Sequence, residues 1–120
     1  MAKTALLFAG QGAQVVGMGR DLAEKYPAAR ALFARANETL GYDLTQICFE
    51  GPEDELHQTI NTQPALVTVS FACLKAAQDR SGCNGLPPPS FVAGHSLGEY
   101  TALAAAGVLD FTTTVYLARE

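Results

Sequence analysis

The chain has 120 residues, of which 48% are hydrophobic and 17% are charged, and its formal net charge is −4. This length and apolar content suit one domain at most. Eight Lys and Arg residues scattered among twelve acidic residues exclude a basic surface for nucleic acid. The apolar run near the N-terminus is too short for a signal peptide or a membrane span. We therefore expect a cytoplasmic protein that binds neither nucleic acid nor membrane.

Cysteine and histidine are too sparse to predict a disulfide framework or a metal site. The three cysteines, Cys48, Cys73 and Cys83, are odd in number and widely spaced, which favours buried or free thiols. The two histidines, His57 and His95, belong to no cluster with metal-ligand spacing. We expect no structural metal.

The first third of the chain predicts a strand, a glycine-rich loop and an amphipathic helix. Residues 4–9 (TALLFA) are almost wholly apolar, which is typical of a strand buried on both faces in a parallel sheet. Residues 10–19 (GQGAQVVGMG) then form the loop. Over residues 22–40 apolar side chains recur at spacings of three and four, as on one face of a helix. Pro27 kinks this helix or starts a second one, and Gly41 ends it.

The middle of the chain predicts short helical pieces followed by a longer helix. Residues 43–60 suit short helices with a turn at Gly51-Pro52. The segment Thr62-Gln63-Pro64 resembles a helix start, because proline is favoured in the first turn. On that helix we expect a buried face made of Leu66, Val69, Cys73, and Ala76 or Ala77. Residues 81–90 contain three consecutive prolines and predict a surface loop.

The last third predicts a second strand, a tight turn and two helices. Residues 91–93 suit a short strand that runs into the segment GHSLGEY at 94–100. An alanine-rich helix follows and stops near Gly107, and Asp110 is placed to cap a final helix. Because that helix is still in pattern at Glu120, we expect the sequence to end inside an element. The order of elements predicts an α/β fold, a parallel sheet flanked by helices.

The pattern Gly94-x-Ser96-x-Gly98, between a strand and a helix, is typical of a nucleophile elbow. Its glycines let the backbones of the strand and the helix pass closely while the serine occupies a sharp turn. The serine hydroxyl then stands at a helix N-terminus, where N–H groups and the helix dipole favour developing negative charge. The amide of Leu97 is the first donor expected in an oxyanion hole. The five-residue pattern alone also arises by chance, so the interpretation depends on the flanking strand and helix.

A serine nucleophile needs a general base, and neither histidine suits that role. His95 adjoins Ser96 on a tight turn, so the two side chains point in different directions, and we expect His95 to shape the elbow. His57 lies in the polar stretch PEDELHQ and is interpreted as a surface residue. The base is therefore expected outside these 120 residues.

The first part of the glycine-rich loop, residues 10–14, does not match the nucleotide-binding motifs. A dinucleotide fingerprint requires glycine or alanine at position 15, which is Val15, and a phosphate loop requires lysine at position 18, which is Met18. Because parallel strands end at one edge of a sheet, Gln11 could lie beside Ser96 and donate its backbone N–H to the oxyanion. A simple connecting loop explains the same residues.

Three motifs in this order, FAGQGAQ, TQPAL and GHSLGEYTALAAAGVLDF, resemble the malonyl-CoA:acyl carrier protein transacylases of fatty-acid synthesis. The resemblance spans nearly the whole chain. It implies that Ser96 is the acylated nucleophile, that the amides of Gln11 and Leu97 form the oxyanion hole, and that Gln63 lines the site.

The resemblance also implies what residues 1–120 lack. They correspond to the N-terminal part of an α/β-hydrolase-like large subdomain, without its C-terminal part and without the small ferredoxin-like subdomain. The family's general-base histidine belongs to a later segment, and its malonyl-binding arginine would fall just beyond Glu120. Arg119 does not match the position of that arginine. We expect the isolated chain to have negligible transfer activity.

For the complete protein the resemblance implies transfer of a malonyl group from malonyl-CoA to the phosphopantetheine thiol of acyl carrier protein, without a cofactor and as a monomer. FAGQGAQ begins close to Met1, which favours a stand-alone protein. Three alternatives stay open: a polyketide-type acyltransferase with a different acyl specificity, a serine thioesterase or esterase, and a non-catalytic fragment.

Overall fold

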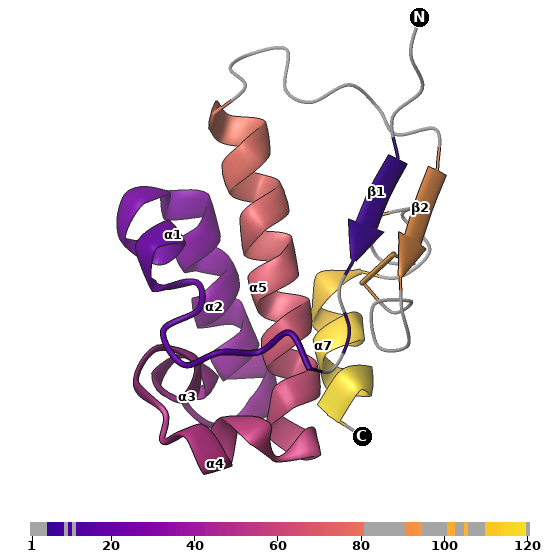
Figure 1. Cartoon of the computed structure of the whole chain (residues 1–120). Coiled ribbons are helices and arrows are strands. Elements are labelled where there is room, and N and C mark those ends of the chain that lie inside the picture. Colours follow the sequence, from indigo (N-terminus) through magenta and orange to yellow (C-terminus); the bar gives the residue numbers. More distant parts are fainter. Residues whose placement is uncertain are drawn as a thin grey trace, which may run out of the picture.

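The computed structural model describes residues 5–8, 10, 12–80, 91–94, 101–102, 105 and 110–119. They form a group of helices beside a small parallel sheet (Figure 1). The elements in chain order are β1 (Ala5–Phe8), α1 (Arg20–Lys25), α2 (Pro27–Leu40), α3 (Leu44–Glu50), α4 (Glu53–His57), α5 (Thr59–Arg80), β2 (Phe91–Gly94) and α7 (Phe111–Arg119). This arrangement confirms the predicted α/β class.

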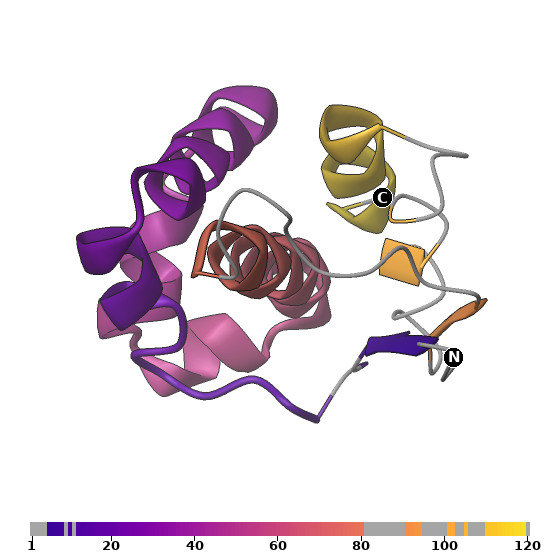
Figure 2. The ribbon, with the colours of Figure 1, turned by 90° about the horizontal axis from the view of Figure 1, so that it is seen from above.

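The two strands pair in parallel, as the sequence predicts, and Ala5 is the partner of Phe91. The prediction that residues 4–9 are buried on both faces is wrong at Leu7, which is 79% exposed. Its partner Ala93 is exposed as well, and paired residues of neighbouring strands point to the same face of a sheet. The described helices lie on one side of the sheet (Figure 2), which accounts for the open face.

Pro27 starts a second helix and does not kink a longer one. It is the first residue of α2, where the missing N–H is not needed and the fixed φ suits the helix. Gly41 ends α2 with a φ of 81°, and its N–H donates to the carbonyl of Asn37 at 2.9 Å. This left-handed cap confirms the predicted end of the helix.

Residues 43–60 form two short helices and the start of α5, in agreement with the prediction of short helical pieces. Asp43 caps α3, because its carboxylate accepts the N–H of Gln46 at 3.1 Å. Gly51 lies between α3 and α4 with a φ of 81°, and a Cβ added there would lie 3.2 Å from the side chain of Val16. Both the backbone conformation and the close approach of the glycine-rich loop therefore favour glycine at this turn.

The central helix α5 begins earlier than the sequence suggests. The predicted start at Thr62-Gln63-Pro64 is wrong, because α5 begins at Thr59 and Pro64 lies inside it. The N–H and the hydroxyl of Thr62 both donate to the carbonyl of Gln58, at 2.8 and 3.0 Å. These bonds extend the helix on the N-terminal side of the proline.

The buried face of α5 also differs in part from the expected one. Two expected positions are buried and one is half-buried: Leu66, Ala76 and Val69. Cys73 is exposed, so its predicted burial is wrong, and Phe71 and Ala72 are buried nearby. Helices α2, α4 and α7 all pack against α5. Residues on several sides of α5 are therefore buried, and not only those on one helical face.

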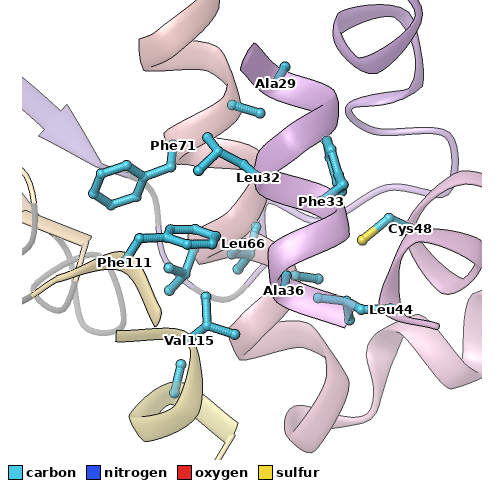
Figure 3. Packing of buried hydrophobic residues seen from close by; sticks show 14 of the residues in the cluster. Ala29, Leu32, Phe33, Ala36, Leu44, Cys48, Leu66, Phe71, Phe111 and Val115 are labelled. Carbon is cyan, nitrogen blue, oxygen red and sulfur yellow. The ribbon is translucent and has the colours of Figure 1, made fainter. Parts of the chain in front are cut away.

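Figure 3 shows the core that α2, α3, α5 and α7 share. Large side chains from all four helices contribute to it: Leu32, Phe33, Leu44, Leu66, Phe71, Phe111 and Val115. Phe33 packs edge-on against Phe49 with ring centroids 5.1 Å apart, a favoured arrangement of aromatic pairs. Burial raises the pKa of the Cys48 thiol to about 12, so this thiol stays neutral. The expectation of a buried cysteine is confirmed at Cys48.

Several predictions concern residues outside the described part of the chain. They are the loop at 81–90 with Cys83, the end of the alanine-rich helix near Gly107, and the course of the last helix at Glu120. Residues 101, 102 and 105 are helical, in agreement with the predicted helix. Among the described residues, no helix is long and apolar enough to cross a membrane, and no three potential ligands gather at a metal site.

Asp110 caps α7, as predicted. Its carboxylate accepts the N–H of Thr113 at 2.7 Å, and its carbonyl accepts the N–H of Thr114 at 3.0 Å. Hydrogen bonds from the backbone and the side chain of Thr113 hold the pKa of Asp110 below its usual value of 3.8. The ionised carboxylate therefore stabilises the start of this helix.

We expect Asp110→Ala to lower the Tm of the whole protein at neutral pH, because the first turn of α7 loses an acceptor. The folded-state pKa of Asp110 is depressed, so its stabilising effect is present above the usual pKa and is lost as the pH falls through the folded-state pKa. Thermal melts of wild type and variant should differ at neutral pH and converge under strongly acidic conditions. Equal Tm values at neutral pH would contradict this account, and Thr112→Ala, an exposed position in the same turn, is the control.

Candidate active site

The candidate site lies at the edge of the sheet where β1 and β2 both end. Phe8 and Gly94 are register partners, so the chain leaves the two strands at neighbouring points. Gln11 is the third residue after Phe8, and Leu97 is the third residue after Gly94. In open parallel sheets, ligands bind at the carboxyl ends of the strands. The pairing therefore favours the predicted meeting of the glycine-rich loop and the elbow.

A hollow of about 300 Å³ lies at this end of the sheet. Among the described residues, the last two of each strand line it: Leu7, Phe8, Ala93 and Gly94. Apart from Gly94, these side chains are apolar. The hollow offers an apolar space directly beside the points from which the two predicted catalytic segments leave the sheet.

Hydrogen bonds hold the loop after β1 on both sides of position 11. The N–H of Ala13 donates to the carbonyl of Gly10 at 3.3 Å. The side-chain Oε1 of Gln14 accepts the N–H of Gly12 at 2.7 Å. Gly12 has a φ of 109°, a conformation that favours glycine. The residues that flank Gln11 thus belong to one closed turn.

Gln14 also links this loop to α4, a connection that the sequence did not predict. Its Nε2 lies 2.8 Å from Nδ1 of His57, and Nε2 of His57 lies 3.1 Å from Oε1 of Glu53. An amide nitrogen only donates and a carboxylate only accepts, so a neutral His57 with its proton on Nε2 satisfies both contacts. His57 is partly exposed, with 43% of its side chain accessible, so its interpretation as a surface residue is confirmed, but it is not isolated.

No pattern in the sequence relates Gln14 to His57, because 43 positions separate them. The only local signal is that Gln14, like Gln11, is a long polar side chain in a loop otherwise made of glycine and apolar residues. Such a side chain is buried only when its amide is hydrogen-bonded. Gln14 is 9% exposed, and both ends of its amide have partners.

Of the predicted site residues, the structure describes two. Gly94 ends β2, and Gln63 is half-buried in the second turn of α5. Figure 1 shows that α5 runs opposite to the strands, so its N-terminal half, which carries Gln63, lies on the side toward which the strands point. Five predicted residues lie outside the described part of the chain: Gln11, His95, Ser96, Leu97 and Gly98.

Comparison with known proteins gives consistent results. The malonyl CoA-acyl carrier protein transacylase of Bacillus subtilis strain 168 is 51% identical over 120 residues, which is 100% of this chain and 36% of that protein. A structure of an acyl carrier protein S-malonyltransferase from Vibrio cholerae has a TM-score of 0.89 at 47% identity, over 98% of this chain and 37% of that one. A type II PKS acyl-carrier protein in complex with its malonyl-transacylase also gives 0.89, at 45% identity and the same coverage.

The chain spans little more than a third of the length of the malonyl CoA-acyl carrier protein transacylases of Bacillus subtilis strain 168 and Escherichia coli K12 that it matches. Within that span the likeness is continuous, since residues 5–118 match the family model described as "Acyl transferase domain". The match includes both strands and the segments that follow them. The chain belongs to the acyl transferase domain family.

Proposed function

We propose that the whole protein transfers a malonyl group from malonyl-CoA to the phosphopantetheine thiol of an acyl carrier protein, as in fatty-acid synthesis. The observation that carries this proposal is the parallel pairing of Phe8 with Gly94, which favours a meeting of Gln11 and Ser96 at one edge of the sheet. The similarity to malonyl transacylases in sequence and in fold supports it.

Residues 1–120 are then the N-terminal part of the large subdomain of an α/β-hydrolase-like acyltransferase. The C-terminal part of that subdomain and the small ferredoxin-like subdomain come from outside these residues. The open sheet face at Leu7 and Ala93 supports this assignment, because an apolar face of this kind is normally covered in an α/β protein.

Ser96 is the nucleophile in this proposal. Its Oγ attacks the thioester carbonyl carbon of malonyl-CoA while a general base takes the hydroxyl proton. The tetrahedral intermediate collapses, the C–S bond breaks, and coenzyme A leaves as the thiol after receiving a proton. The phosphopantetheine thiol then attacks the acyl-serine, and the serine hydroxyl is restored as malonyl-carrier protein forms.

The oxyanion of each tetrahedral intermediate is assigned to the amides of Gln11 and Leu97. One such donor contributes on the order of 10²- to 10³-fold to the rate. Gly94 and Gly98 give the elbow its sharp turn, and His95 shapes it. Gln63 lines the site.

The general base and the arginine that binds the malonyl carboxylate are assigned to residues beyond Glu120, so the isolated chain is expected to be inactive. Arginine suits that second role because its planar fork binds a carboxylate through two hydrogen bonds. On the family resemblance alone we also propose that the whole protein is a cytoplasmic monomer with malonyl-CoA as substrate and no resident cofactor.

The acceptor distinguishes this function from hydrolysis. Transfer exceeds hydrolysis only when water is kept from the acyl-serine while the carrier thiol enters.

The test is to incubate the whole protein with malonyl-CoA and holo-acyl carrier protein and to measure malonyl-carrier protein, free malonate and coenzyme A. We expect malonyl-carrier protein and coenzyme A in equal amounts, with little free malonate. Free malonate without malonyl-carrier protein would contradict the proposal and favour a thioesterase or esterase.

Assays with a second acyl-CoA donor and a second carrier protein distinguish malonyl transfer in fatty-acid synthesis from the alternative of a polyketide-type acyltransferase. One solved relative is a complex of a type II PKS acyl-carrier protein with its malonyl-transacylase, so the assay should include carriers from both pathways. Preference for a donor other than malonyl-CoA would contradict malonyl specificity.

A further inference from the structure

The strongest feature that the proposed function does not use is the side chain of Gln14. It is 9% exposed and folds back onto its own loop, where Oε1 accepts the N–H of Gly12 at 2.7 Å. The other end of the same amide lies 2.8 Å from His57 Nδ1. A single buried amide therefore joins the turn around position 11 to a residue on α4.

The hydrogen bonds through Gln14 form one directed chain. It runs from Gly12 N–H to Gln14, from Gln14 Nε2–H to His57, and from His57 Nε2–H to the carboxylate of Glu53 at 3.1 Å. Each donor and acceptor in this chain has only one consistent assignment. The first two bonds are partly buried, whereas the pair of His57 with Glu53 is exposed, so the link from Gly12 through Gln14 to His57 contributes most of the restraint.

Helix α4, which carries both His57 and Glu53, is anchored in the helical core by Leu56, which is fully buried. The loop is also joined to α3, because the N–H of Gly17 donates to the carbonyl of Cys48 at 2.7 Å. The loop after β1 is thus held against a packed part of the molecule, and among the described residues of the loop Gln14 makes the side-chain attachment to α4.

We propose that Gln14 and His57 are positioning residues that hold the turn around Gln11 for oxyanion stabilisation, an inference that rests on the proposed function. The carbonyl of Gly10 accepts the N–H of Ala13 at 3.3 Å, and the side chain of Gln14 closes the same turn through the N–H of Gly12 at 2.7 Å.

The occupied amide of Gly12 sharpens the assignment. Because its N–H donates to Gln14 at 2.7 Å, it is not the donor to the substrate, which agrees with the assignment of that role to Gln11 by the family resemblance. Loss of the Gln14 side chain releases the Gly12 amide and loosens the turn without removing any group that touches the substrate.

The test compares variants of the whole protein by steady-state malonyl transfer. Gln14→Ala and His57→Phe are expected to lower kcat by about 10- to 100-fold, since small misplacements of a preorganised site cost rate on this scale. The KM for malonyl-CoA should change far less. His57→Asn keeps an acceptor near the position of Nδ1 and should retain most of the wild-type kcat. Asp54→Ala, an exposed position on the same helix, is the matched control.

The outcomes separate the two proposals. Wild-type transfer with an unchanged kcat in Gln14→Ala and His57→Phe would overturn the positioning role alone. A wild-type protein that transfers no malonyl group would overturn the proposed function and, with it, this inference. If Gln14→Ala does not fold, the comparison of His57→Phe with His57→Asn still tests the proposal, because His57 is partly exposed and its substitution should be tolerated. A kcat for His57→Asn as low as that for His57→Phe would contradict the positioning role.

Discussion

Ser96→Ala is expected to abolish malonyl transfer by the whole protein while leaving its Tm and its affinity for malonyl-CoA unchanged. Without the hydroxyl no acyl-serine forms. The oxyanion donors can then assist only a direct attack of the carrier thiol on malonyl-CoA. Loss of a nucleophile that works with a base and an oxyanion hole lowers kcat on the order of 10⁴-fold or more. Malonyl-carrier protein formation, followed by mass spectrometry, measures the effect.

A matched serine controls for the substitution itself. Ser70 is half-buried on α5 and belongs to none of the predicted site segments, so Ser70→Ala should keep the wild-type rate. Transfer by Ser96→Ala within about tenfold of wild type, a difference of only about 1.4 kcal/mol in barrier, would exclude Ser96 as the nucleophile.

The largest expected effect on stability is that of Phe33→Ala. Phe33 is 2% exposed and packs edge-on against Phe49. Its ring also packs against the backbone of Gly19 at the end of the glycine-rich loop, since a Cβ added there would lie 2.6 Å from the ring. Truncation of such a buried ring to alanine destabilises a protein by about 3–5 kcal/mol, through lost burial and a residual cavity.

Denaturant unfolding of the whole protein measures this change in the free energy of unfolding. Arg35→Ala is the control, because Arg35 is exposed on the same helix, and exposed substitutions usually stay within about 0.5 kcal/mol. A loss for Phe33→Ala below about 1 kcal/mol, less than burial of one ring implies, would show that the packing around α2 is looser than the structure indicates.

Local features of the fold could be predicted from the sequence because they depend on a few neighbouring residues. Pro27 and Gly41 bound a helix through their own backbone preferences, and Asp110 caps one through its side chain. The two short apolar runs predicted parallel strands, and the register of Phe8 with Gly94 agrees.

Other features could not be predicted. Pro64 suggested a helix start, but hydrogen bonds from Thr62 to Gln58 begin α5 before the proline. The remaining features depend on distant contacts. Cys73 fits an apolar stripe, yet the several helices packed around α5 decide which positions are buried. The contact of Gln14 with His57 spans 43 positions, and it arises only when α4 folds against the loop.

In the candidate site, too, some residues could be predicted from the sequence and others could not. Motif spacing and family resemblance predicted Gln11, Gln63, Ser96 and Leu97, and the strand pairing favours the meeting of two of the three motifs that carry them. The hydrogen bonds that brace the loop came only from the structure, because they join side chains and amides that no linear pattern relates.

The most direct test of the central claim is to incubate the whole protein with malonyl-CoA in the absence of carrier protein and to locate the acyl group by peptide mass spectrometry. We predict a malonyl ester on Ser96 that disappears when holo-carrier protein is added. A malonyl group on another residue, such as the exposed thiol of Cys73, with Ser96 unmodified while transfer proceeds, would contradict the account.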